Sequence, residues 1–314
     1  MMATAQYAQS VRRLSHVSVH NGHDAFQDVP WPGPDEPALD PEDPRFALAS
    51  SHPLAATAWY RSLSVPQQAR FGLELTTQTL KYGISFESVL SQGLIEFARA
   101  QPNRSPEYRY ALHELIEESQ HSLMFQEFID RSGTDPQPFG GFDAWLDRRV
   151  PWLGHGFPEL LMSLVLAGEI FVDQDNRKML RTADLHPLLR RIIQIHVTEE
   201  ARHLCFARRL LEQRLPTLSP VRREIIAWVL PFSLADSAKK MLQPAPCLVT
   251  RFAIPPATLA EAFGPGSAHR AEIADVVEPV RALAAAHGMF RPRHERHWRR
   301  RGLLRSPRAG YSGS

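Results

Sequence analysis

The chain has 314 residues, of which 43% are hydrophobic and 22% are charged. These are ordinary globular values, so the composition excludes an intrinsically disordered chain and allows a sizeable hydrophobic core. The formal net charge of +2 excludes a global electrostatic field that would recruit nucleic acid. The two cysteines, Cys205 and Cys247, are too few for a disulfide framework, and neither lies in a Cys-x-x-Cys pair.

The apolar segments of the chain bear on its cellular location. The N-terminal sequence has no apolar stretch of the kind found in secretory signals. Charged residues interrupt every candidate for a run of about 18 apolar residues, the length that a membrane-spanning helix needs. We therefore expect a soluble, cytoplasmic protein that binds neither membrane nor nucleic acid.

Composition divides the chain into three segments. Residues 1–50 are expected to form a flexible arm, because the stretch 31–44 is rich in proline and acidic residues. Residues 51–287 are expected to form the folded domain. Residues 288–314 form an Arg-rich tail, since 291–308 contains eight arginines and one glutamate. We expect this tail to be solvated or loosely packed; the alternative is a docking segment for an acidic electron donor or acyl carrier.

The middle segment is helical almost throughout. Proline near the first helical position, with a serine cap at Ser105, predicts long helices over about 65–100, 106–131, 157–182 and 186–215. A fifth helix should follow Ser219-Pro220 and bend at Pro231. Shorter helices are expected over 256–263 and 269–287, and no alternating strand pattern of convincing length is found. The fold class is therefore predicted to be all-α, with additional helices after the fourth long one.

Acidic residues and histidines occupy helix positions that should be apolar. Glu118 and His121 are spaced i, i+3, and they share one face of the second long helix. His196, Glu200 and His203 are spaced i, i+4, i+7, and they form a stripe on the fourth. Two Glu-x-x-His pairs, completed by single glutamates on two further helices, are the ligand set of a ferritin-like di-iron bundle. Carboxylates and imidazoles suit iron, and manganese has overlapping preferences.

The two remaining helices must each supply a glutamate. Glu169 is a lone carboxylate inside the apolar run 164–172 of the third helix. The first helix offers Glu74, Glu87 and Glu96. The loop between the first two helices centres near residue 103, about 14 residues before the glutamate ligand of the second helix. An antiparallel partner at the same height should lie about 14–17 residues before the loop, which selects Glu87.

Helical spacing alone leaves some alternatives open. Glu117 is i, i+4 to His121, and Glu199 is i+3 from His196, so both neighbours also have ligand spacing. Asp173, one turn after Glu169, is expected either to orient a histidine or to be solvated. Burying four carboxylates and three imidazoles without a metal would be very costly, so we predict a metal site.

Over roughly residues 65–250, these motifs resemble the AurF-like non-haem di-iron oxygenases, typified by p-aminobenzoate N-oxygenase. The resemblance rests on the segments 112–127 and 167–171 and on the His-x-x-x-Glu-x-x-His pattern of 196–203. That pattern adds a histidine to the usual set of six ligands. The ligands that the resemblance implies are Glu87, Glu118, His121, Glu169, His196, Glu200 and His203.

The resemblance also implies an activity. Such an enzyme would be a homodimer that holds two iron ions and uses O2 to convert an aromatic amine to hydroxylamine, nitroso and nitro products in secondary metabolism. An external donor of the ferredoxin or reductase type would supply electrons. Alternatives are a C–H hydroxylase or desaturase acting on a small or carrier-bound substrate, and an iron-storage bundle. Candidates for binding a substrate carboxylate are Arg177, Arg181 and Arg251.

Overall fold

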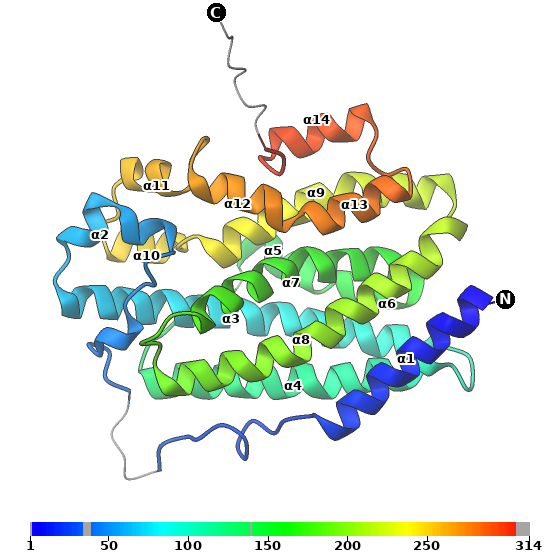
Figure 1. The fold of residues 1–314 in the computed structure, drawn as a ribbon, viewed down its shortest axis with the longest axis horizontal. Coiled ribbons are helices and arrows are strands. Elements are labelled where there is room, and N and C mark those ends of the chain that lie inside the picture. The colour runs from blue at the N-terminus through cyan, green and yellow to red at the C-terminus, as the bar shows by residue number, and fades with distance from the viewer. Residues whose placement is uncertain (1, 34–38, 139, 306–314) are drawn as a thin grey trace, which may run out of the picture.

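The structure is a computed structural model that describes residues 2–33, 39–138 and 140–305. Within these ranges the chain forms helices and no β-strand, which confirms the prediction of an all-α, ferritin-like fold (Figure 1). No helix in the described ranges is long and apolar enough to cross a membrane. The bundle is built from four long helices, α3 (Val65–Arg99), α4 (Pro106–Ser132), α7 (Pro158–Leu180) and α8 (Pro187–Arg214).

The ends of these helices follow from local sequence. The Ser64 side chain accepts a hydrogen bond from the backbone of Gln67 and closes a capping box at the start of α3. Ser105 caps α4 in a similar way, and proline occupies an early position in all four helices. Gly133 ends α4 with a φ of 67°, a conformation that glycine adopts without steric cost. The predicted bounds therefore agree closely with the observed ones.

Small residues let the helices of the bundle approach closely. A Cβ atom on Gly168 of α7 would lie 2.4 Å from the ring of Phe86 on α3. A Cβ atom on Gly154 would lie 2.0 Å from the backbone oxygen of Gly93 on α3. Gly154 belongs to one of the short elements, which are η1 (Pro44–Phe46), η2 (Pro53–Ala56), α2 (Ala58–Ser62), α5 (Gly141–Asp147), η3 (Val150–Trp152), α6 (Leu153–Gly156) and η4 (Leu215–Thr217).

The N-terminal segment differs from the expected flexible arm. Residues Met2–His20 form helix α1, which lies against α4 and α8 (Figure 1). Tyr7, Val11 and Leu14 are spaced i, i+4, i+7 and pack into the main core, so the helix is held by one apolar face. The chain after α1 stays attached, because the backbone N–H of Ala25 donates to Gln120 on α4 at 2.8 Å. Part of the Pro-rich run, residues 34–38, lies outside the described residues.

Among the described residues, six further α-helices follow α8. The single helix expected over 269–287 is two helices, because the turn at Val277 precedes Glu278-Pro279, and a proline cannot continue the helix before it. Pro231 lies inside the fifth long helix, as expected. The bounds are α9 (Pro220–Leu242), α10 (Pro246–Arg251), α11 (Pro256–Phe263), α12 (Ala268–Val276), α13 (Glu278–Ala286) and α14 (Pro292–Arg300).

The expectation of a solvated or loosely packed C-terminal tail is wrong for residues 292–305. Helix α14 places the fully buried Trp298 edge-on against Phe290, and Leu303 is buried beyond it. His294, four residues before Trp298, shares its face and bonds Glu224 of α9 at 3.0 Å. The helical period therefore separates a buried face from the arginines, which composition alone does not reveal. Residues 306–314 lie outside the described residues.

Candidate metal centre

The seven predicted ligands come together between the four long helices. All seven side chains are buried, with at most 3% of their surface exposed. They comprise Glu87 from α3, Glu118 and His121 from α4, Glu169 from α7, and His196, Glu200 and His203 from α8.

Two glutamates lie between two histidines at the centre of this cluster. His121 Nδ1 lies 3.6 Å from Glu118 Oε2 and 3.4 Å from Glu200 Oε1. His203 Nδ1 lies 2.9 Å from Glu118 Oε1 and 3.0 Å from Glu200 Oε1. Each carboxylate therefore faces both histidines, and the four side chains together would offer oxygen and nitrogen ligands to metal ions.

The potential ligand atoms gather in overlapping sets. Within each set, one donor atom from every member lies within 4.8 Å of the others. The sets are Glu87, His121 and His196; Glu118, His121 and Glu200; Glu169, His196 and Glu200; and Glu114, Glu118 and His203. Because the sets share members, the arrangement suits more than one cation.

Several of these buried atoms have no hydrogen-bond partner. They are Glu87 Oε1, Glu118 Oε2, His121 Nδ1 and Glu200 Oε2. An unsatisfied buried polar group costs about 1–3 kcal/mol, more when it is charged, so a native fold rarely leaves so many together. Cations bound among these oxygen and nitrogen atoms would satisfy them, so the donor set fits a pair of metal ions.

Two further carboxylates, Glu199 and Glu117, accept hydrogen bonds from the histidines on the side away from the central glutamates. His121 Nε2 donates to Glu199 Oε2 at 2.9 Å, and His203 Nε2 donates to Glu117 Oε2 at 2.8 Å. Arg202 donates to Glu117 at 2.7 Å and lies 3.4 Å from Glu199, so it bridges the two outer carboxylates. These bonds hold Nε2 of each imidazole on the outer side and direct Nδ1 toward the central carboxylates, where it could bind a metal.

This arrangement bears on the alternatives that spacing left open. Glu118 and Glu200 face the centre, whereas Glu117 and Glu199 lie on the outer side of the histidines. The support is reciprocal, because the outer carboxylate of α4 holds a histidine of α8 and the outer carboxylate of α8 holds a histidine of α4.

His23 also supports the centre, and the sequence analysis missed it. Its backbone N–H donates to Glu199 Oε1 at 3.2 Å, and its Nδ1 lies 3.0 Å from the same oxygen. The residue follows α1, 176 positions away from Glu199 in the chain. No local pattern connects two residues so far apart, so only the packing of α1 reveals this contact.

A third pattern surrounds His196. Its Nε2 lies 3.7 Å from both Glu87 Oε1 and Glu200 Oε1, and its Nδ1 lies 3.1 Å from the side-chain amide of Asn176. The contacting atom of Asn176 is its amide nitrogen Nδ2, which donates to Nδ1 and so fixes the orientation of the ring. Asn176 thus takes the orienting position that was considered for Asp173, which instead pairs with Arg177 at 2.8 Å.

Glu114 is a fifth central carboxylate that the sequence analysis did not select. It is fully buried one turn before Glu118, and neither of its oxygens has a hydrogen-bond partner. It forms a potential ligand set with Glu118 and His203. Its i, i+4 spacing to Glu118 was the available signal, because the two residues share a helix face.

In the absence of metal, acidic residues and histidines of the cluster have shifted protonation equilibria. Burial raises the pKa of Glu114 and of Glu169 well above the ordinary value, and neighbouring carboxylates add to this. Burial works to lower the pKa of His121 and His203, but the facing carboxylates outweigh it and hold both well above the ordinary value. Bound cations would let the carboxylates ionise and the imidazoles lose their protons.

The other acidic candidates of α3 lie outside the cluster. Glu74 pairs with Arg251, and Glu96 pairs with Arg99 at 2.8 Å. Glu87 alone of the three lies against His196 and His121, and its second oxygen accepts a 2.7 Å hydrogen bond from Ser122.

Comparison with known proteins shows the family of the chain. An uncharacterized protein of Mycobacterium tuberculosis (strain ATCC 25618 / H37Rv) is 34% identical over 296 residues, which span 94% of this chain and 87% of the relative. An uncharacterized protein of Mycobacterium bovis (strain ATCC BAA-935 / AF2122/97) matches to the same extent. The model of the family described as p-aminobenzoate N-oxygenase AurF matches residues 4–288. The chain therefore belongs to the AurF family of p-aminobenzoate N-oxygenases, a di-iron enzyme family.

Proposed function

We propose that the protein is an O2-dependent di-iron oxygenase that oxidises an aromatic amine through hydroxylamine and nitroso stages to a nitro group. The observation that carries this proposal is the buried cluster of glutamates and histidines, in a chain of the AurF family. Two ferrous ions in this cluster would supply the electrons that activate O2.

The residues of the chain have distinct tasks in this proposal. Glu118 and Glu200 would hold the ions from the centre of the cluster, together with the unpartnered atoms of Glu87 and His121. Glu169, His196 and His203 would complete the set. The outer carboxylates and Arg202 would keep the imidazoles in one tautomer and one orientation. Burial of the whole set excludes bulk water, which would otherwise compete for open ligand positions.

The electron balance of the proposed reaction requires an external electron donor. When one oxygen atom of O2 is transferred to nitrogen and the other leaves as water, two electrons and two protons must be supplied. We propose an external donor of the ferredoxin or reductase type for the electrons, with solvent as the source of protons. We also propose that the enzyme is a homodimer, which light scattering combined with gel filtration would test directly.

The test begins with anaerobic loading of Fe(II). We expect about two irons per chain, and O2-dependent conversion of at least one compound in a panel of arylamines to its hydroxylamine, nitroso or nitro product. Mass spectrometry after reaction under ¹⁸O2 would show the label on nitrogen. The variant His203→Ala should lose both bound iron and product, whereas Glu212→Gln on the exposed side of α8 should keep both.

Other outcomes would contradict the proposal. Label on a ring carbon, or loss of two hydrogens without oxygen incorporation, would point to C–H hydroxylation or desaturation. A large cage that accumulates ferric iron without oxidising any amine would indicate an iron-storage bundle. A protein that binds no iron would refute the metal site itself.

A further inference from the structure

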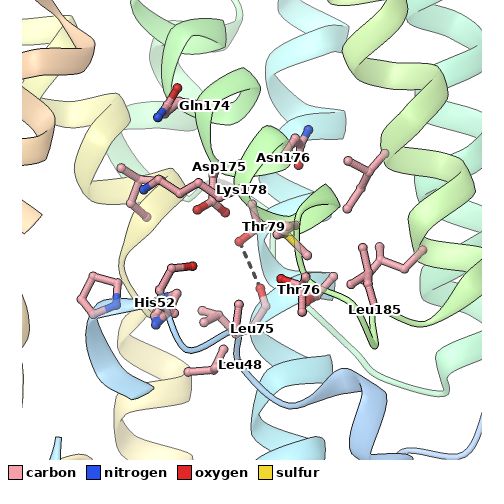
Figure 2. A pocket seen from close by; sticks show the side chains of 18 of the residues that line it. Leu48, His52, Leu75, Thr76, Thr79, Gln174, Asp175, Asn176, Lys178 and Leu185 are labelled. Carbon is pink, nitrogen blue, oxygen red and sulfur yellow. Dashed lines mark hydrogen bonds between the residues drawn. The ribbon is translucent and has the colours of Figure 1, made fainter. Parts of the chain in front are cut away.

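A cavity of about 300 Å³ lies next to the cluster of glutamates and histidines. Its walls come from α7, from the segment that follows η1, and from α3, α8, α9 and α12. Asn176 lines this cavity and at the same time contacts Nδ1 of His196. Figure 2 shows Asp175, Asn176 and Lys178 of α7 facing Leu48 and His52 across the space. One side chain therefore separates the cavity from a proposed iron ligand.

We propose that this cavity binds the substrate and that it selects a ring-sized amine carrying no negative charge, in preference to an arylcarboxylate. This inference rests on the proposed function, because it assumes that the cavity next to the cluster holds the molecule to be oxidised. It differs from the aminobenzoate that the family description names.

The size and walls of the cavity suit a small aromatic molecule. A volume of about 300 Å³ lies at the lower end of the range for small-molecule sites. Apolar side chains form much of the wall, among them Leu75, Phe171, Leu189 and Met241. Hydroxyl and amide groups such as Thr76 and Gln174 interrupt this surface. An apolar surface with a few polar groups is typical of a site that buries an aromatic ring and orients its substituents.

The cations at the cavity already have carboxylate partners. Lys178 forms an ion pair with Glu272, and both residues line the cavity. Arg45 is exposed and donates two hydrogen bonds to Asp43 from its Nε and one from its Nη2. The three arginines first considered for carboxylate binding are not among the described lining residues. A buried ligand carboxylate would therefore meet no unpaired cation among those residues, which makes its desolvation costly.

Asp175 gives this wall an excess of negative charge. Its carboxylate lines the cavity beside the Lys178–Glu272 pair, so the three side chains sum to one negative charge when all are ionised. Burial raises the pKa of Asp175 to about 6, with Lys178 opposing this shift and Glu272 adding to it. The carboxylate is therefore largely ionised at pH 8, where it repels a ligand anion and tolerates a neutral or cationic group.

Two neutral imidazoles complete the polar lining. Burial lowers the pKa of His52 to about 3 and that of His269 to about 4, so neither ring is charged near neutral pH. Nε2 of His269 is buried without a hydrogen-bond partner. Both rings line the cavity, so they offer a ligand hydrogen bonds without a positive charge. This unsatisfied nitrogen is an independent sign that a ligand group belongs here.

The test compares two ligands of nearly the same shape. p-Aminobenzoate and p-aminobenzamide would be titrated into the iron-loaded protein by calorimetry, without O2, at pH 8. We expect the amide to bind at least about tenfold more tightly than the acid. Equal affinity, tighter binding of the acid, or no binding of the amide at millimolar concentration would overturn the inference.

Two matched variants test whether the selectivity depends on a charge in the cavity. Asp175→Asn removes the negative charge and should reduce the ratio of the two affinities by at least about threefold. The control Asp275→Asn makes the same change at an exposed position of α12, and it should leave the ratio unaltered. An unchanged ratio in Asp175→Asn would refute the assigned role of this charge. Because binding is measured without turnover, a selectively bound amide that is never oxidised would contradict the proposed function alone.

Discussion

At the scale of single residues, the centre depends on reciprocal support between α4 and α8. Glu199 and Glu117 each hold a histidine of the opposite helix, and Arg202 lies between the two carboxylates. Burial would raise the pKa of both carboxyls, but His203 and Arg202 lower the pKa of Glu117, and His121 and His23 lower that of Glu199 to about 2. These outer residues therefore determine how firmly the orientation of each imidazole ring is fixed.

The first prediction concerns Glu199→Gln. The amide would be a weaker acceptor for His121 Nε2–H and would leave the ring less well oriented, so the affinity for Fe(II) should fall by about 10–100-fold. Competition with a coloured chelator under anaerobic conditions measures this affinity. Glu212→Gln, an exposed position on the same helix, is the control. Unchanged iron affinity in Glu199→Gln would mean that the outer carboxylate has no part in metal binding.

The second prediction concerns Glu114→Gln. Burial raises the pKa of the Glu114 carboxyl, so folding near neutral pH requires it to take up a proton. A neutral amide avoids this cost and should raise the melting temperature of the metal-free protein. If Glu114 contributes a ligand together with Glu118 and His203, the same change should lower iron affinity at least about tenfold. Calorimetry of the metal-free form and chelator competition measure the two effects. Higher stability with unaltered iron affinity would exclude Glu114 from the ligand set.

At the scale of elements, two terminal helices are part of the packed body. Helix α1 supplies Val11 to the main core, and α14 supplies Trp298 to the same core. Neither segment has the composition of a core helix, because α14 is mostly arginine and histidine. A few apolar residues at helical spacing are sufficient when the bundle offers a complementary surface.

Trp298→Ala provides the third prediction. Removing a fully buried indole should lower the free energy of unfolding by about 3–5 kcal/mol, because the transfer free energy of the ring is lost and a cavity is left in its place. The control is Trp152→Ala, since that side chain is 66% exposed and its loss should cost less than about 0.5 kcal/mol. Urea denaturation of both variants gives the comparison. Equal stabilities would show that α14 does not pack on the bundle in solution.

At the scale of the whole molecule, the cluster of glutamates and histidines lies where the four long helices meet, so its charges affect the stability of the entire fold. Without metal, Glu114 and Glu169 favour their protonated forms, and His121 and His203 favour their charged forms. Ligands that bind only the folded state stabilise it by mass action, so bound iron should raise the melting temperature.

The fourth prediction is a pH dependence of this effect. A group whose pKa is higher in the folded than in the unfolded state contributes stability that is lost as the pH rises through the folded value. Glu114, Glu169, His121 and His203 all have raised pKa values, so the metal-free protein should lose stability between about pH 5 and pH 8. The lowered pKa of Glu199, about 2, acts only below this window.

Calorimetric scans of metal-free and Fe(II)-loaded protein across this range would measure the dependence. The loaded protein should keep its melting temperature as the pH rises, because the metal replaces the protons on these groups. Parallel curves for the two forms would contradict the assignment of these residues to the metal.

The sequence by itself determined the all-α class, the bounds of the long helices and the ligand candidates. These features depend on local rules: proline and serine at helix starts, glycine after a helix end, and spacings of three and four residues that align side chains on one face. The choice of Glu87 also followed from sequence, because an antiparallel hairpin links residues at equal distances from its loop.

Only the tertiary structure decided which side each carboxylate faces and which distant residues support the site. Glu117 and Glu118 are adjacent, and a rotation of the helix by less than half a turn would exchange their roles, so the packing of α4 against α8 decides between them. His23, Asn176 and the cavity beside α7 belong to no local pattern. Their positions depend on contacts between segments far apart in the chain, which helical spacing does not encode.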